Sequence, residues 1–136
     1  GNSGLLSAGS VQWMTAGRGI LHSEMPEQED GRMWGFQLWV NLPARAKMIA
    51  PRYQDIPPAD IPLVTTPGGQ RLKVIAGEFH GARGPIENVA AEPVYVDLEL
   101  AAGGRETLAL PAGHNAFVYC YEGAVDVGKD DVARVG

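Results

Sequence analysis

The clearest pattern in the sequence is an alternation of apolar and polar positions around residue 97. The apolar positions are Val94, Val96, Leu98 and Leu100, and the positions between them are Tyr95, Asp97 and Glu99. A period of two is typical of a β-strand that is buried on one side, so the pattern predicts a strand here. Gly103-Gly104 then predicts a turn.

Short apolar stretches elsewhere predict further strands. One covers residues 70–76 and another covers residues 105–110. Residues 117–121 and 124–127 flank the dipeptide Glu122-Gly123, which predicts a hairpin. Eighteen glycines and ten prolines supply many tight turns between the short apolar stretches and leave little room for helices. The chain is therefore expected to have an all-β fold.

The pattern changes between Asn41 and Gly69, where prolines are expected to interrupt regular strand pairing. These prolines are Pro43, Pro51, Pro57, Pro58, Pro62 and Pro67. One short helix is expected near residues 44–48. Apolar anchors are expected to keep this stretch ordered, which a flexible linker would not be. The anchors are Met48, Ile49, Tyr53, Ile56 and Ile61.

Charge and cysteine content exclude several classes of function. The formal net charge is −5, and the basic residues are scattered, so direct nucleic-acid binding is disfavoured. No apolar run reaches the roughly 20 residues that a membrane-spanning helix needs. The single cysteine, Cys120, cannot form an internal disulfide, which suits the cytoplasm or, in a eukaryote, the nucleus. We expect Cys120 to be a small core residue.

The tripeptide His22-Ser23-Glu24 carries the most specific chemistry. On a strand, residues two apart share one face, so the imidazole of His22 and the carboxylate of Glu24 could reach one metal ion. On a helix the same spacing would separate them. Gly17, Gly19 and Pro26 favour a short strand. The structural alternative is a plain hydrogen bond between His22 and Glu24.

Other residues with chemical potential are given structural roles. His80 and His114 are expected on turns or at the surface. Trp13, Trp34 and Trp39 are expected in core or interdomain packing. The glycine-bearing stretches 17–19 and 81–85 do not have the spacing of a phosphate-binding loop, so they are expected to be turns.

Five stretches of the sequence resemble the pirin family, within the cupin superfamily. The longest is GSVQWMTAGRGILHSEMP at residues 9–26. The others are GFQLWVNLP at 35–43, PRYQDI at 51–56, VIAGE at 74–78 and LPAGHNAFVY at 110–119. The resemblance covers nearly the whole chain.

The resemblance implies two cupin barrels in tandem, of which the first holds a single iron through three histidines and one glutamate. His22 and Glu24 match two of those ligands. The other two belong to an H-x-H motif that precedes Gly1 in the family and is absent here. In the second barrel the matching positions fall on about Ala109 and Pro111, so that barrel is expected to be metal-free.

The resemblance also divides the chain. Residues 1–42 match the end of the metal-binding barrel, residues 43–69 the interdomain connector, and residues 70–136 the beginning of the second barrel. The chain is accordingly expected to be an internal fragment that is inactive alone. Exposed strand edges and apolar lining would make it aggregate or dimerise by strand exchange.

The implied function of the intact protein is a flavonol dioxygenase resembling quercetinase, acting on a small aromatic substrate. Fe(II) is the expected cofactor, with Mn(II), Ni(II) or Zn(II) compatible with the same ligands. Glu24 would take the substrate proton. One alternative is a non-catalytic, redox-responsive transcriptional cofactor whose partners are proteins. The other is a metal-free small-molecule-binding barrel.

Overall fold

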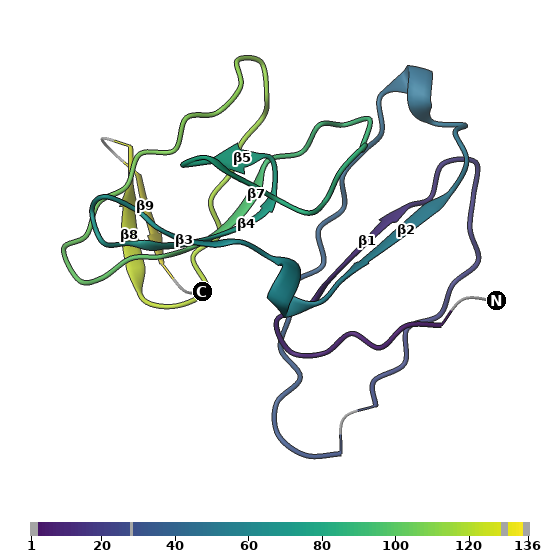
Figure 1. Cartoon of the computed structure of the whole chain (residues 1–136), viewed down its shortest axis with the longest axis horizontal. Helices are drawn as coiled ribbons and strands as arrows, with labels where there is room; N and C mark the ends of the chain where they lie inside the picture. Colours follow the sequence, from purple (N-terminus) through teal and green to yellow (C-terminus); the bar gives the residue numbers. More distant parts are fainter. Residues whose placement is uncertain (1–2, 28, 129–130, 135–136) are drawn as a thin grey trace.

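The computed structural model describes residues 3–27, 29–128 and 131–134. Within them the regular elements are strands and two 3₁₀ helices joined by long irregular segments, and no α-helix is present there (Figure 1). The strands are β1 (Val11–Thr15), β2 (Arg52–Ile56), β3 (Leu63–Thr65), β4 (Arg71–Ala76), β5 (Glu78–Phe79), β6 (Ala82–Arg83), β7 (Tyr95–Glu99), β8 (Ala124–Val127) and β9 (Asp131–Arg134). The 3₁₀ helices are η1 (Ala44–Ala46) and η2 (Pro58–Asp60). The paired strands are all antiparallel, which confirms the all-β class.

The first sheet is the antiparallel pair β1–β2, which lies on one side of the molecule (Figure 1). Val11 stands opposite Ile56, and the pairing runs on to Thr15 opposite Arg52. Gln12 Nε2 donates to Asp55 Oδ1 across the two strands at 2.8 Å. Because the two strands are far apart in sequence, this sheet forms only in the folded chain.

The expectation that prolines interrupt pairing between residues 43 and 69 is wrong, because β2 and β3 both form there and pair with neighbours. The prolines lie at the ends of the strands, where a missing N–H costs no ladder hydrogen bond. Pro51 precedes β2, and Pro58 begins η2. The short helix expected near 44–48 is present as η1. The domain boundaries stay a prediction.

The central sheet has the order β3-β4-β7. Leu72 and Val74 on β4 are fully buried, and they stand opposite Leu98 and Val96 on β7. The alternating side chains of β7 therefore do cover a core, which confirms the strand predicted from the period of two. The pairing shifts between Val74 and Ala76, so a bulge interrupts the ladder there.

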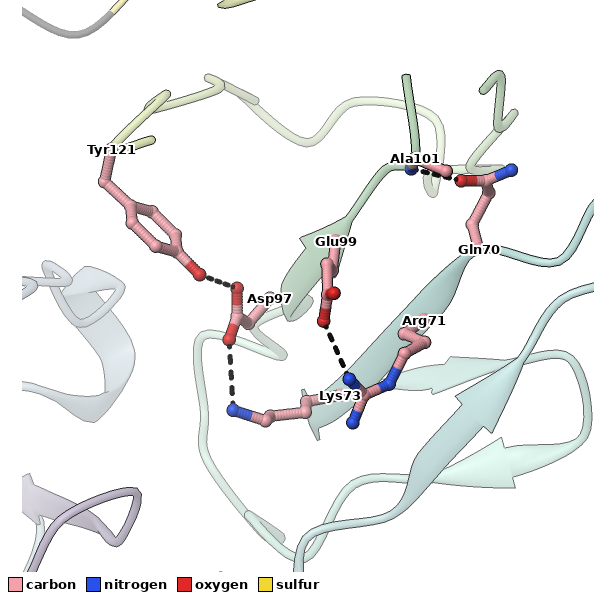
Figure 2. A network of polar contacts seen from close by, with 7 residues as sticks. All are labelled: Gln70, Arg71, Lys73, Asp97, Glu99, Ala101 and Tyr121. Atoms are coloured by element: carbon pink, nitrogen blue, oxygen red, sulfur yellow. Dashed lines mark hydrogen bonds and ion pairs between the residues drawn. The ribbon is translucent and has the colours of Figure 1, made fainter. Parts of the chain in front are cut away.

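The outer face of this sheet carries charged pairs between β4 and β7 (Figure 2). Arg71 NH1 lies 3.1 Å from Glu99 Oε2, and Lys73 Nζ lies 3.4 Å from Asp97 Oδ2. Arg71 and Glu99 are both more than half exposed, so their pair contributes little free energy and mainly favours this register.

A buried glutamine joins two turns at the end of the central sheet. Gln70 Nε2 donates to Gly68 O at 2.7 Å. Gln70 Oε1 accepts from Ala101 N at 2.9 Å (Figure 2). Gly104 N donates to Ala101 O at 2.8 Å, which confirms the turn predicted at Gly103-Gly104.

A second apolar cluster connects the β1–β2 pair to the rest of the chain. Its buried members are Ile61, Ile75, Ala76, Ile86 and Val89. Val11, Trp13, Ile56, Ala91 and Tyr95 pack against them. The packing role predicted for Trp13 is thus confirmed. The same prediction is wrong for Trp39, which is 87% exposed.

Two of the expected strands are not formed in the described part of the chain. In residues 105–110, Thr107 N donates to the Glu106 carboxylate, so that donor is not available to a strand ladder. Residues 117–121 form no strand and do not pair with β8, whose partner is β9. Cys120 is only half-buried and lies outside both apolar clusters, so its predicted core role is wrong.

The structure also bears on membrane association. Among the residues it describes, none of the helical segments has the length and hydropathy that a bilayer crossing requires.

Candidate metal centre

The backbone reaches the candidate ligands through a tight turn. Gly19 N donates to Ala16 O at 2.9 Å, and Arg18 N donates to Ile49 O at 3.0 Å. Gly17 has a φ of +52°, and a Cβ there would collide with the carbonyl oxygen of Ile49. A glycine is therefore required at this point, which confirms the turn predicted for residues 17–19.

His22 and Glu24 face each other after this turn. His22 Nε2 lies 4.0 Å from Glu24 Oε1, and their side chains are 42% and 56% exposed. The strand predicted for this stretch is not formed, because within the described residues the backbone has no partner strand. The i, i+2 spacing nevertheless brings the two side chains to one side, as it does in an extended backbone.

The two donors fit a divalent transition metal. Imidazole nitrogen and carboxylate oxygen bind such ions at about 2.1 Å, so two neighbouring ligands of one ion lie roughly 3.0–3.4 Å apart. The pair at 4.0 Å must therefore close by a small side-chain rotation to share an ion. Two ligands do not complete a site, and no group of three or more candidate ligands occurs among residues 3–27, 29–128 and 131–134. The assignment of His22 and Glu24 as ligands stays a prediction.

Sequence reasoning missed a neighbour of this pair. Gln37 Nε2 lies 3.3 Å from Glu24 Oε2 and 3.5 Å from Glu24 Oε1. Gln37 is a single polar residue between Phe36 and Leu38, in a stretch that continues with apolar Trp39 and Val40. This pattern gives no signal for the contact with Glu24, which depends on how two segments meet in space.

The other histidines lie elsewhere. His80 is in the turn between β5 and β6, and its Nε2 lies 3.4 Å from Glu106 Oε1. His114 is exposed and donates its backbone N–H to Pro111 O at 3.3 Å within a turn. Both histidines therefore have the turn positions that were predicted.

Hydrogen bonding sets the charge state of Glu106. The hydroxyl of Thr66 has the largest effect and holds the pKa of this carboxyl below its ordinary value. Burial opposes that shift, while Thr107 N–H and His80 add to it. Glu106 thus remains an anion, and it contacts His80 in the β5–β6 turn.

Comparison with known proteins decides the family. The pirin family model matches residues 1–40, which include both candidate ligands and Gln37. A Pseudomonas aeruginosa protein named "Putative quercetin 2,3-dioxygenase" is 53% identical over 93% of this chain and 46% of its own length. The chain belongs to the pirin family.

Other pirin relatives carry different names. A Caulobacter vibrioides "Pirin-like protein" is 48% identical over 97% of this chain and 48% of its own length. Human "Pirin" is 39% identical over 98% of this chain and 45% of its own length. The chain thus spans about half the length of the curated relatives it matches. No solved structure matched it significantly.

Proposed function

We propose that this chain contributes His22 and Glu24 to the mononuclear iron site of a pirin-type flavonol dioxygenase. The convergence of His22 Nε2 and Glu24 Oε1 at 4.0 Å, on an exposed part of the chain, carries this proposal. The Pseudomonas aeruginosa relative named for quercetin 2,3-dioxygenase supports the class of reaction. Two further histidine ligands are expected from sequence preceding Gly1.

Each residue has a separate part in the proposed chemistry. A bound divalent metal supplies Lewis acidity and open positions for a substrate hydroxyl and dioxygen. The neutral imidazole of His22 offers a nitrogen lone pair and fixes one side of the site. If its bond to the metal loosens, the carboxylate of Glu24 would accept the proton of the substrate hydroxyl, and this role would make it the catalytic base.

The test uses the longest natural polypeptide that contains this chain, reconstituted anaerobically with Fe(II). Oxygen uptake is then measured with and without a flavonol. We expect about one iron per chain and uptake that depends on the flavonol. An iron-loaded protein without flavonol-dependent uptake would overturn the enzymatic proposal.

Substitution of Glu24 separates binding from proton transfer. Loss of a positioned general base slows a reaction by roughly 10²–10⁴-fold, so Glu24→Gln should lower turnover by that order per bound iron. Iron content is measured in parallel. A Glu24→Gln protein that keeps both its iron and full turnover would remove the proposed proton role.

A second candidate is the redox-responsive interaction protein. The residues flanking the candidate ligands favour it, because Leu21 is fully exposed and Met25 is 79% exposed. Such side chains suit contact with another protein more than contact with water. Iron binding without flavonol-dependent oxygen uptake would favour this candidate over the dioxygenase.

A further inference from the structure

The side-chain amide of Gln37 donates to the carboxylate of Glu24. Its nitrogen lies 3.3 Å and 3.5 Å from the two carboxylate oxygens. An amide NH₂ group only donates, so this nitrogen fixes the carboxylate without competing for a cation. Hydrogen bonds of this kind orient carboxylate ligands and tune their affinity for metals.

Phe36, next to Gln37, packs the segment that carries Gln37 against two tyrosines. The ring centroid of Phe36 lies 5.1 Å from that of Tyr121 and 5.7 Å from that of Tyr119. Trp34 meets Tyr121 edge to face, with 5.5 Å between ring centroids. Such ring pairs are favourable beyond the area that they bury. The segment of Gln37 therefore docks on the segment of Tyr121.

Tyr121 is hydrogen-bonded to Asp97 of the central sheet. Its hydroxyl donates to Asp97 Oδ1 at 2.6 Å, while Asp97 Oδ2 accepts from Lys73 Nζ at 3.4 Å. Figure 2 shows the carboxylate of Asp97 between the phenol and the ammonium group. The bond to Asp97 is the main cause that raises the pKa of Tyr121 to about 12, so the phenol stays a donor at neutral pH.

We propose that Gln37 is a positioning residue that keeps the Glu24 carboxylate turned toward His22, and that Tyr121 anchors Gln37 to the β4–β7 sheet. The inference rests on the proposed metal site. It gives the second half of the chain a part in that site, because the sheet supports the ligand through Asp97, Tyr121 and Phe36. Neither Gln37 nor Tyr121 touches the metal.

The first test measures metal affinity. Gln37→Leu keeps the size of the side chain and removes its donors. The matched control is Gln12→Leu, which removes another exposed hydrogen bond from a glutamine amide to a carboxylate, that of Asp55. Affinity for Co(II) is measured anaerobically against a chromophoric chelator, in the longest natural polypeptide that contains this chain.

Loss of such an orienting partner typically weakens metal affinity by 10–100-fold, so Gln37→Leu should bind Co(II) at least about 10-fold more weakly. Gln12→Leu should match the unsubstituted protein. Equal affinity in Gln37→Leu and unsubstituted protein would overturn the inference and leave the proposed function standing. An unsubstituted protein that binds no Co(II) or Fe(II) would overturn both.

The second test needs no metal. The side-chain amide of Gln37 gives an NMR signal whose shift reports its hydrogen bond to Glu24. Tyr121→Phe keeps the ring and removes the bond to Asp97, so the Gln37 signal should move toward the value of a free amide. Tyr119→Phe is the control and should leave the signal unchanged. An unmoved signal in Tyr121→Phe would overturn the anchoring role.

Discussion

At Gly17 the backbone leaves no room for a side chain. Its φ of +52° lies in the left-handed region, and the carbonyl oxygen of Ile49 occupies the space that a Cβ would need. Arg18 N donates to the same carbonyl. The turn that leads to His22 is therefore fixed by a contact with a distant segment as well as by local geometry.

We expect Gly17→Ala to destabilise the protein, because it adds both backbone strain and a steric clash. Left-handed strain alone costs about 1–3 kcal/mol, which corresponds to a fall of several degrees in melting temperature. Thermal unfolding followed by circular dichroism measures this fall in melting temperature. Gly35→Ala is the control, since a Cβ there meets nothing within 4 Å. Equal melting temperatures for the two variants would contradict the expectation.

The candidate site was predictable only where its geometry is local. The spacing of His22 and Glu24 was enough to place both side chains together, because residues two apart share a side where the backbone is extended. The partner of Glu24 was not predictable, since Gln37 is thirteen residues away and reaches it through tertiary contacts. The sequence His22-Ser23-Glu24 therefore indicated the two candidate metal ligands but not Gln37, which donates a hydrogen bond to Glu24.

At the scale of elements, a polar cluster of Glu106, Thr66 and His80 joins the loop of Glu106 to the turn before β4 and to the β5–β6 turn. Glu106 receives a hydrogen bond from Thr66, and its Oε1 lies 3.4 Å from His80 Nε2 in the β5–β6 turn. Thr66 Oγ1 also accepts from Gln70 N at 3.2 Å. Ionised Glu106 thus ties the β5–β6 turn to the turn that precedes β4.

This cluster predicts a loss of stability in acid. The pKa of Glu106 lies below its ordinary value of 4.5 in the folded chain. Its stabilisation is therefore complete above pH 4.5 and disappears as the pH falls through the folded pKa. We expect Thr66→Val to weaken this pH dependence, because the Thr66 hydroxyl lowers that pKa the most. Melting temperatures between pH 3 and pH 6 measure the change.

Thr65→Val is the control for this prediction, because Thr65 is an exposed neighbour on β3 and does not contact Glu106. It should keep the acid dependence of the unsubstituted protein. Thr66→Val also loses a partner of Gln70, so its stability at neutral pH should be lower as well. An unchanged acid dependence in Thr66→Val would count against the role of Glu106.

The elements were predicted well where one face of a strand meets a core. The alternation around residue 97 identified β7, and residues 70–76 became β4, because burial on one side imposes a period of two. Residues 105–110 also contain apolar residues at alternating positions, but they are not in a strand. The backbone N–H of Thr107 donates to the side chain of Glu106 and not to a neighbouring strand. Propensity alone does not decide which segments find partners.

At the scale of the whole molecule, large apolar side chains remain outside both clusters. Leu21, Trp39, Met25 and Phe117 are each at least 75% exposed. Exposed apolar surface on this scale marks an interaction site or a tendency to associate. The candidate metal centre lies among these side chains, since Leu21 and Met25 flank His22 and Glu24.

We expect the chain as printed to associate with itself. Its weight-average mass in sedimentation equilibrium should rise with concentration, because association buries apolar surface. The double substitution Leu21→Ser and Trp39→Ser should reduce the association, whereas Thr65→Ser should not. A monomer of constant mass at every concentration would show that the exposed side chains do not drive association.

The sequence by itself determined the all-β class, the turns at glycine, the strands that cover a core and the pair His22 and Glu24. These features depend on backbone sterics and on the period of side chains along a strand, which act over a few residues. Only the tertiary structure decided that β2 pairs with β1, that Tyr121 docks on Asp97 and that Gln37 meets Glu24. Those contacts join segments distant in sequence, and their geometry is set by packing that no local pattern encodes.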